Sequence, residues 1–383
     1  MNFQPLRDFL DYYVSMLGIP GTDTVVYKNH EEIFRHTAGY DDLRFKTPMR
    51  DNAHYYVYSI SKLVLATATA QLIERGEIML SDPLYAYIPE YENMTVKAYD
   101  EGGREYIKRA EHPITLKHLI TMTAGFNYNL KAPSIVDTVN KTGGRAPTMD
   151  IIRELAREPL DFEPGADYKY SLAHDVMGAV IEVASGMPYS NYVKENIFAP
   201  LGMTKSGYKG DPELFANMTK KYVLEDGIIK EDDSTKNPFV FGSEYDCAGA
   251  GLITTVDDII LLADALACGG VGKSGERILS RFSIDLMRTN MLNEAQLKSF
   301  VNGTANKLGY GYGMGVRTLM SHNEGGTIAP IGEFGWDGAL AAYVGCDMDN
   351  GISVYHAENV SGFNSHQMVH PRLRNVIYGC LGE

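Results

Sequence analysis

A serine and a lysine stand three residues apart, at Ser59 and Lys62. If a helix begins at Ser59, both side chains lie on one face, with their Cβ atoms about 5 to 6 Å apart. A serine hydroxyl becomes a nucleophile only when a neighbouring group takes its proton, and a buried lysine can do this or stabilise the alkoxide. The S-x-x-K pattern therefore indicates acyl transfer to Ser59. The alternative is a serine N-cap followed by a solvated lysine.

A second proton-handling group is needed beside such a serine, and Tyr170 is a candidate. A phenolate close to a lysine ammonium can accept the proton of a hydroxyl. The alternative is that Tyr170 packs as an amphipathic residue, as most of the 25 tyrosines must. Among the ten histidines, His174 is the one that could join this site, because it stands three residues after Ser171.

An oxyanion site is predicted at Trp336-Asp337-Gly338-Ala339, a stretch that holds the only tryptophan. Gly338 lets the backbone come close to a ligand. The N–H of Ala339 could then pair with the N–H of Ser59 as two donors to a developing oxyanion. The alternative is an edge strand with a packed indole.

A central helix must position the serine and lysine. Residues 63–73 are almost entirely apolar or small, so this segment has no wet face and must be buried. Arg75 and Gly76 are typical of a helix end, with a cation in the last turn and a permissive residue at the cap. Ser59 is therefore expected at the entrance of a buried helix, where backbone N–H groups favour negative charge.

The remaining patterns predict a mixed fold. Helices are expected at 6–17, 114–122, 149–157, 173–185, 189–197, 256–266, 280–292 and 373–380, and strands at 24–28, 33–37, 312–319, 340–344 and 352–355. Strands near both ends, with helices between them, predict one sheet built from both termini and a helical insertion. We expect one lobe from residues 1–80 and 245–383 and a helical lobe from 81–244.

Composition limits the partners and the compartment. The net charge of -14 argues against nucleic acid and anionic membrane surfaces. No apolar run reaches the roughly 18 to 20 residues of a membrane span, and the first residues do not resemble a secretory signal. The four cysteines form no C-x-x-C pair and are typical of core thiols in a reducing compartment. We therefore expect a cytoplasmic protein. The cysteines are Cys247, Cys268, Cys346 and Cys380.

Two other patterns do not fit the chemistry that they suggest. Residues 269–274 resemble a phosphate-binding loop, but Ala267 stands where the first glycine is required and a helix precedes the segment. His366 and His370 have the spacing of a zinc helix, yet Gln367 replaces the required glutamate. No serine has glycines at both -2 and +2, which excludes the nucleophile elbow of α/β-hydrolases.

Eight short stretches together resemble the large serine hydrolase family that contains class C β-lactamases, DD-peptidases, D-aminopeptidases and β-lactamase-like esterases. Each stretch alone is unspecific, but all eight stand in family order along nearly the whole chain. They are Gly18-Ile19-Pro20-Gly21; Ser59-Ile60-Ser61-Lys62; Leu80-Ser81-Asp82-Pro83-Leu84 with Ile88-Pro89-Glu90; Ile114 to Leu119 through Ala124-Gly125; Pro164-Gly165 through Tyr170-Ser171; Ala248-Gly249-Ala250-Gly251-Leu252; Gly309-Tyr310-Gly311-Tyr312-Gly313; and Gly335-Trp336-Asp337-Gly338.

The resemblance implies an α+β fold of the β-lactamase and transpeptidase type. An antiparallel sheet flanked by helices would be joined by an inserted all-α lobe, with the active site in the crevice between the two lobes. The resemblance also implies Ser59 as the acylated nucleophile, Lys62 and Tyr170 as its proton partners, and the Ala339 N–H as half of the oxyanion hole. No metal or organic cofactor is implied, since the acyl-serine route needs none.

Two departures from the family pattern bear on the substrate. The peptidases and β-lactamases have asparagine two residues after the tyrosine, where this chain has Leu172, and lysine at the start of the third motif, where it has Trp336. Loss of an amide partner and a cation costs roughly 2 to 5 kcal/mol of discrimination for such substrates. A tryptophan face favours an uncharged, apolar group. The family's esterases have tryptophan at this position, so we expect a carboxylesterase.

Other functions remain open at this point. The acyl group on the serine could pass to a second alcohol, which would make the protein an acyltransferase. A β-lactamase, a D-Ala-type peptidase or a D-aminopeptidase is the alternative enzyme, and a non-catalytic binding module on the same fold is a remoter one. The expected partner is a small-molecule ester or amide. The sequence does not indicate an oligomeric state.

Overall fold

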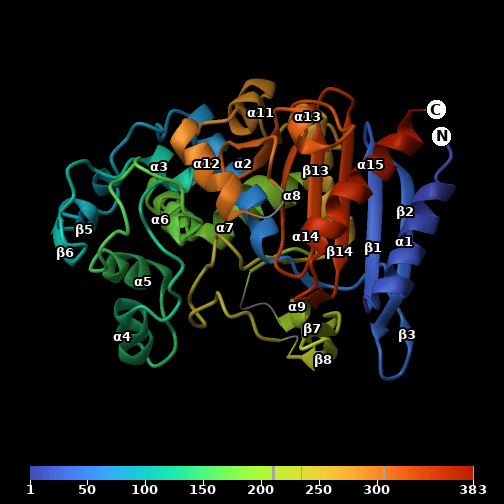
Figure 1. The fold of residues 1–383 in the computed structure, drawn as a ribbon, viewed down its shortest axis with the longest axis horizontal. Coiled ribbons are helices and arrows are strands. Elements are labelled where there is room, and N and C mark those ends of the chain that lie inside the picture. Colours follow the sequence, from blue (N-terminus) through green and yellow to red (C-terminus); the bar gives the residue numbers. More distant parts are fainter. Residues whose placement is uncertain (209–211, 234, 305–306, 383) are drawn as a thin grey trace.

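Both ends of the chain contribute strands to one antiparallel sheet in the computed structural model, which describes residues 1–208, 212–233, 235–304 and 307–382 (Figure 1). The strand order is β10-β11-β12-β13-β14-β1-β2-β3. The join between the two ends is the β1–β14 pair, in which Val25 faces Tyr355. The expected sheet from both termini is confirmed. Its strands are β1 (Gly21–Lys28), β2 (Glu31–Asp42), β3 (Thr47–Pro48), β10 (Tyr310–Tyr312), β11 (Arg317–Leu319), β12 (Phe334–Asp337), β13 (Tyr343–Asp347) and β14 (Ile352–Glu358).

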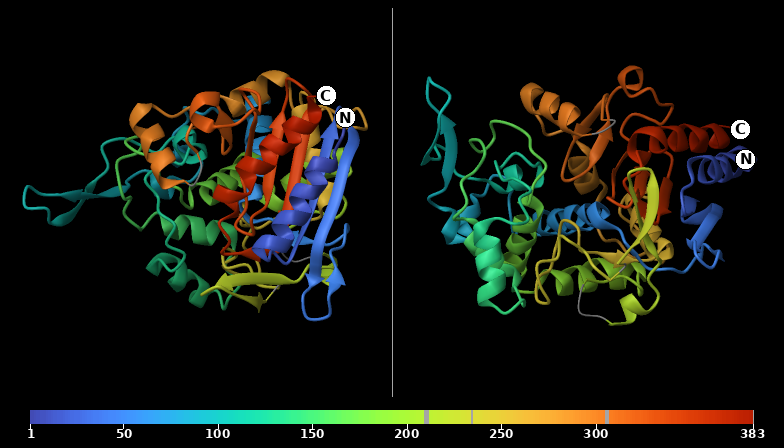
Figure 2. Two further views of the ribbon diagram at one scale, coloured as in Figure 1. Left: turned by 45° about the vertical axis from the view of Figure 1, so that its right-hand side comes forward. Right: turned by 60° about the horizontal axis from the view of Figure 1, so that its bottom comes forward.

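Helices cover both faces of this sheet. Successive strand residues point to opposite faces, so Val25 and Val26 join two different hydrophobic clusters. On the Val26 face lie α1 (Gln4–Leu17) and α15 (His370–Leu381), side by side near the two termini (Figure 2). The helix α10 (Val256–Ala267) packs on the Val25 face. The expected helices at 6–17, 256–266 and 373–380 are confirmed.

The central helix α2 (Ser61–Glu74) is buried along nearly its whole length. A 3-10 turn at Tyr58–Ile60 precedes it and runs directly into it. Ser59 lies in this turn, so the α-helix begins two residues after the serine rather than at it. Between Ala53 and Leu72, Ser59 is the one residue that is not buried. The helix is thus buried, while Ser59 in the turn before it stays partly exposed.

The segment between the two halves of the sheet is mainly helical, but it is not all-α. Two β hairpins interrupt it, and one of them projects from the body of the protein (Figure 2). The first turns around Gly102 and Gly103 and its second strand is mostly exposed, and the second turns at Asp226 and Gly227, both with positive φ. An Asp-Gly turn of this kind favours a hairpin locally. The second hairpin is also joined to the C-terminal segment, because its first strand pairs with residues 360–361 and its Tyr222 is buried in the same cluster as Val26. The hairpin strands are β5 (Thr95–Tyr99), β6 (Glu105–Arg109), β7 (Lys221–Glu225) and β8 (Ile228–Asp232).

Short helices and strands complete the described chain. The expected strand at 312–319 is wrong, because two strands form there around a turn in which Gly315 has φ +72. No helix in the described ranges is both long and apolar enough to cross a bilayer. The remaining elements are α3 (Leu116–Ile120), α4 (Pro133–Lys141), α5 (Thr148–Leu155), α6 (Ala173–Ser185), α7 (Tyr189–Val193), α8 (Ala199–Leu201), α9 (Pro212–Ala216), α11 (Arg281–Arg288), α12 (Glu294–Gly303), α13 (His322–Gly325), α14 (Ser365–Met368), β4 (Tyr55–Tyr56), β9 (Ile253–Thr254) and β15 (Val360–Ser361).

A buried ion pair inside the sheet gives a stability prediction. The Arg317 guanidinium donates to Glu333 at 3.0 Å, and both side chains are 1% exposed. The variant Arg317→Met leaves the Glu333 carboxylate buried without its cation, so we expect the free energy of unfolding to fall by about 3 to 5 kcal/mol. Urea denaturation measures this change. Arg104→Met, which breaks an exposed pair with Asp100, is the control and should leave the midpoint unchanged. Equal midpoints for the two variants would contradict the prediction.

Candidate active site

Three side chains predicted from the sequence meet at one oxygen atom. The Nζ of Lys62 lies 3.2 Å from the Oγ of Ser59, and the phenol oxygen of Tyr170 lies 2.7 Å from the same Oγ. Lys62 comes from the first turn of α2, whereas Tyr170 stands 111 positions after Ser59 in the chain and precedes α6. The hydroxyl of Ser59 thus has two neighbours that can accept its proton or stabilise its alkoxide.

The backbone at the serine is held in an uncommon conformation. Tyr58 has φ +46, a left-handed value that a bulky residue seldom adopts. The hydroxyl of Ser61 stabilises this turn, because it donates to the Tyr58 carbonyl at 2.5 Å and accepts from the Leu252 N–H at 3.1 Å. Strain of this kind persists only where the surroundings enforce it, and it is common at active sites. The turn points the Ser59 side chain out of the core.

A buried ammonium needs polar partners, and Lys62 finds one in the Gly249 carbonyl. The Nζ donates to this oxygen at 2.7 Å, and the side chain is 0% exposed. A Cβ at position 249 would stand 3.1 Å from the Asp175 carboxylate and 3.6 Å from the Lys62 Nζ, so glycine lets these groups crowd together. Burial raises the pKa of Asp175, and the Lys62 ammonium opposes that shift. The Gly249 carbonyl therefore holds the Lys62 ammonium in place, within reach of Ser59.

Aromatic rings form the wall on the Tyr170 side of the site. Tyr170 stacks on Tyr128 on one side and on Trp336 on the other, with interplanar angles of 16° and 9°. Phe239 closes the wall edge-on against Tyr128 and Tyr58. The Lys62 Nζ lies 4.7 Å from the centre of the Tyr170 ring. The phenol is thus fixed in orientation beside a cation, and the wall that it belongs to is apolar.

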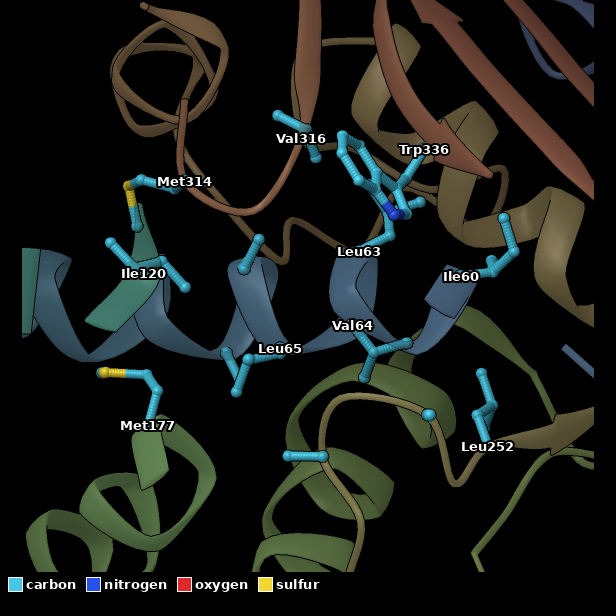
Figure 3. Packing of buried hydrophobic residues seen from close by; sticks show 14 of the residues in the cluster. Ile60, Leu63, Val64, Leu65, Ile120, Met177, Leu252, Met314, Val316 and Trp336 are labelled. Carbon is cyan, nitrogen blue, oxygen red and sulfur yellow. The ribbon is translucent and has the colours of Figure 1, made fainter. Parts of the chain in front are cut away.

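Trp336 is mostly a packing residue in this wall. Its side chain lies against α2 beside Leu63 and Val316 (Figure 3), and the residue is 4% exposed. Its ring stacks on Tyr170 and packs edge-on against Tyr312. The tryptophan face that the sequence suggested for a substrate is therefore small, because neighbouring rings cover it. The main effect of Trp336 is to hold the Tyr170 ring.

The strand β12 brings the third motif against the serine turn. A Cβ on Gly338 would lie 2.5 Å from the Val57 carbonyl and 3.4 Å from the Ile60 side chain, so only glycine allows this contact. Ala339 follows as an exposed turn residue, and no described backbone carbonyl accepts its N–H. The exposed position and the free N–H suit the expected oxyanion donor.

Two histidines hold the turn that carries Ala339. The ring of His366 lies 3.2 Å from the Gly338 carbonyl, and the Nε2 of His370 lies 2.9 Å from the Ala341 carbonyl. The sequence singled out this pair only as a zinc-like spacing. In the structure His366 on α14 and His370 at the start of α15 contact backbone carbonyls on either side of Ala339, in the expected oxyanion turn.

Asp337 faces away from this turn into a buried ion pair. Its carboxylate accepts from Lys307 at 2.6 Å and lies 3.0 Å from the Nδ1 of His370. Although burial opposes ionisation, Lys307 and Arg317 hold the pKa of Asp337 well below its usual range. The Lys307 Nζ also lies 5.5 Å from the centre of the Trp336 ring. A lysine thus stands beside the third motif, but its charge is paired and buried.

The two remaining predicted residues lie behind the reactive oxygen. Leu172 is buried at the start of α6, where its N–H donates to the Asn127 carbonyl at 3.1 Å. His174 is fully buried and its Nε2 lies 3.1 Å from the Ile120 carbonyl. Burial, reinforced by Lys62, lowers the pKa of His174 to about 3, so the ring is neutral. Neither side chain is placed to receive a ligand from solvent.

Sequence reasoning missed several groups that shape this site. Gly249 and Asp175 support Lys62, Tyr128 supports Tyr170, and Lys307 pairs with Asp337. The stretch 248–252 is one of the eight pieces that resemble the family, and this is the sequence signal for Gly249. Nothing local marks Lys307. Among the described residues, one cluster of His, Cys and carboxylate groups could hold a metal, and it lies elsewhere, at His30, Asp264 and Cys268.

The fold is of the β-lactamase type, and the members of that family are serine hydrolases. A family model described as Beta-lactamase matches residues 6–377, so the chain belongs to the β-lactamase family. This confirms the resemblance and the fold class expected from the sequence, apart from the two hairpins in the insertion.

Among individual proteins, the chain is similar to Esterase EstB of Burkholderia gladioli, with 27% identity over 94% of this chain and 90% of that protein. Two solved structures share the fold. One is EstCE1, a hydrolase with promiscuous acyltransferase activity, at a TM-score of 0.77 and 23% identity over 98% of each chain. The other is unliganded simvastatin synthase (LovD) from Aspergillus terreus, at a TM-score of 0.81 and 20% identity over 99% of this chain and 98% of that one. The chain thus has a relative named as an esterase and shares its fold with a hydrolase named for promiscuous acyltransferase activity.

The close approach of Gly338 to the serine turn gives a prediction. In Gly338→Ala the new methyl would meet the Val57 carbonyl, which must move β12 away from Ser59. Because a displacement of about 1 Å can cost a hundredfold in rate, we expect fluorophosphonate labelling of Ser59 to slow by roughly that factor. Gly379→Ala is the control, since a Cβ there meets nothing within 4 Å. Unchanged labelling in Gly338→Ala would show that the contact does not position the site.

Proposed function

We propose that this protein is a carboxylesterase that works through an acyl-Ser59 intermediate. The observation that carries the proposal is the hydroxyl of Ser59 within hydrogen-bond distance of both Lys62 and Tyr170, at 3.2 and 2.7 Å. A nucleophile and a base in direct contact, with the base held by a third group, is the arrangement that covalent acyl transfer requires. The crevice between the two proposed lobes, 81–244 and the rest of the chain, would admit the ester.

The acylation step follows from the contacts. The Ser59 Oγ attacks the ester carbonyl, and its proton passes to the phenolate oxygen of Tyr170 while the Lys62 ammonium offsets the charge on that ring. The N–H groups of Ser59 and Ala339 hold the tetrahedral oxyanion. The intermediate then collapses: Tyr170 returns the proton to the departing alcohol, and the acyl group stays on Ser59. Lys62 keeps its protons throughout.

The deacylation step reverses these roles. A water molecule attacks the acyl carbonyl and gives one proton to the Tyr170 oxygen. The second tetrahedral intermediate releases the carboxylic acid, and the serine oxygen takes the proton back from Tyr170. The site needs no group beyond these residues and water for this cycle. An alcohol in place of water would yield a new ester, so acyl transfer is the second candidate function, favoured by the acyltransferase activity named for EstCE1.

Three features support an ester over a β-lactam or a D-amino acid peptide. Leu172 offers no amide to a substrate carbonyl, and the buried Lys307 ammonium is already paired with Asp337, so neither group can recognise a peptide or its carboxylate. The open wall beside Tyr170, formed by Tyr128 and Phe239, is aromatic and uncharged. The similarity to a protein named Esterase EstB points the same way.

The roles of the three central residues can be tested together. We expect Ser59→Ala to abolish hydrolysis of p-nitrophenyl butyrate, and Lys62→Ala and Tyr170→Phe to lower kcat by about 10² to 10⁴-fold, the usual contribution of a proton-transfer group. Intact-mass spectrometry after a fluorophosphonate should show one adduct on the native chain and none on Ser59→Ala. Tyr128→Phe is the matched control for the phenol, because it keeps the stacked ring. A near-native kcat in Tyr170→Phe would refute its role.

A panel of acyl donors tests the predicted substrate class. Leu172 cannot bind a substrate amide, and Lys307 is already paired and cannot bind a substrate carboxylate. We therefore expect kcat/KM for p-nitrophenyl butyrate to exceed that for nitrocefin or a D-alanyl peptide by roughly 30-fold or more, which corresponds to about 2 kcal/mol. The same preparation of Ser59→Ala measures the background hydrolysis of each donor. A higher kcat/KM for nitrocefin would support the β-lactamase alternative instead. An adduct on Ser59 without turnover of any donor would favour the non-catalytic module.

A further inference from the structure

Three side chains of metal-ligand type converge on the far side of the sheet from α1. Asp264 on α10 and Cys268 at its C-cap are four residues apart, which places them one above the other at the end of one helix face. His30 reaches them from the turn between β1 and β2. The Nδ1 of His30 lies 2.7 Å from one carboxylate oxygen of Asp264, and the Sγ of Cys268 lies 3.7 Å from the other. All three ligand atoms lie within 4.8 Å of one another.

The backbone around this cluster holds the histidine firmly. Asn29 and His30 both have positive φ, and the His30 N–H donates to Asp264 at 3.1 Å. The Asn29 N–H donates to the Gly351 carbonyl at 2.8 Å, which ties the same turn to the loop after β13. Asp264 is 0% exposed, while His30 and Cys268 are partly exposed. The cluster therefore has a rigid buried carboxylate and two ligands that face outward.

An open hollow gives solvent access to the cluster. It has a volume of about 420 Å³ and is lined by His30, Cys268, Asp349 and Arg281, among others. Cys268 is also the C-cap of α10, where the helix dipole favours a cation. The one cation lining the hollow, Arg281, lies 4.0 Å from Asp349, so part of its charge is compensated. A metal ion could enter from this side and retain a water ligand.

We propose that His30, Asp264 and Cys268 form a site for a divalent metal ion of the zinc type, with water as the fourth ligand. Imidazole nitrogen, thiolate sulfur and carboxylate oxygen are the donors that Zn²⁺ selects, and bonds of about 2.0 to 2.3 Å in a tetrahedron separate neighbouring ligands by about 3.3 to 3.7 Å. The observed spacings approach these values. Binding needs the His30 Nδ1 to widen its contact with Asp264 and to carry its proton on Nε2, while the Cys268 thiol gives its proton to solvent.

The site would act on the fold rather than on the ester. It joins the β1–β2 turn to the end of α10, two elements that otherwise meet here through hydrogen bonds to Asp264. None of the three ligands contacts Ser59, Lys62 or Tyr170. Metal occupancy should therefore change stability while leaving ester turnover unaltered. The competing interpretation is a carboxylate that only anchors the turn, with a thiol nearby.

The experiment uses the full-length protein, stripped with a chelator and titrated with Co²⁺ and Zn²⁺. Cobalt reports its ligands directly, because a cobalt–thiolate bond adds a charge-transfer absorption band. The variants are Cys268→Ser, which keeps the size of the side chain, and His30→Asn, which tolerates positive φ and keeps an N–H for Asp264. Cys380→Ser and His112→Asn are the matched controls, since neither residue belongs to the cluster.

We expect one Zn²⁺ per native chain by elemental analysis after dialysis, a rise in Tm on zinc addition and a cobalt–thiolate band. Cys268→Ser should lose the band, and both cluster variants should bind Zn²⁺ more than about tenfold more weakly. The two controls should match the native chain, and chelation should leave p-nitrophenyl butyrate turnover unchanged. A band that survives in Cys268→Ser, or equal zinc affinity in all variants, would overturn the proposal. Esterase activity is read separately, so its absence would not bear on the metal site.

Discussion

The rest of the site depends on one buried ammonium, that of Lys62. Removing a charge from water is costly unless polar groups surround it. The Gly249 carbonyl, the Ser59 hydroxyl and the face of the Tyr170 ring supply these contacts, at 2.7, 3.2 and 4.7 Å. The same contacts fix the position of Lys62 relative to the Ser59 hydroxyl, since the lysine cannot move away without losing them. The same set of contacts thus stabilises the charge of Lys62 and aligns Lys62 with Ser59.

Three separate parts of the chain are needed to build that arrangement. The apolar helix α2 carries Lys62 into the core, the insertion brings Tyr170, and β12 brings Gly338 against the serine turn. Stacked rings join the last two parts, because Trp336 on β12 packs flat on Tyr170. The two histidines of the C-terminal segment then hold the turn after β12. Each part contributes little chemistry alone.

Local patterns predicted the framework well. The segment 63–73, almost entirely apolar or small, could only be a buried helix, and the Asp226-Gly227 pair is a local signal for the hairpin that forms there. The apolar replacement at position 172 was informative too, because Leu172 stands where the family's peptidases have an asparagine and its side chain is buried. The residue type of Trp336 suggested a surface for the substrate. In the structure its neighbours cover all but 4% of it, so most of the ring packs against protein.

The sequence by itself predicted Ser59 as the nucleophile and determined the helix behind it and the family, because residues three apart on a helix are neighbours whatever the rest of the chain does. Only the tertiary structure decided that the Gly249 carbonyl holds Lys62, that Lys307 is neutralised by Asp337 and that His366 and His370 grip the turn at Ala339. These contacts join positions 28 to 187 residues apart. Such distances are set by how the sheet and helices pack, which no local spacing encodes.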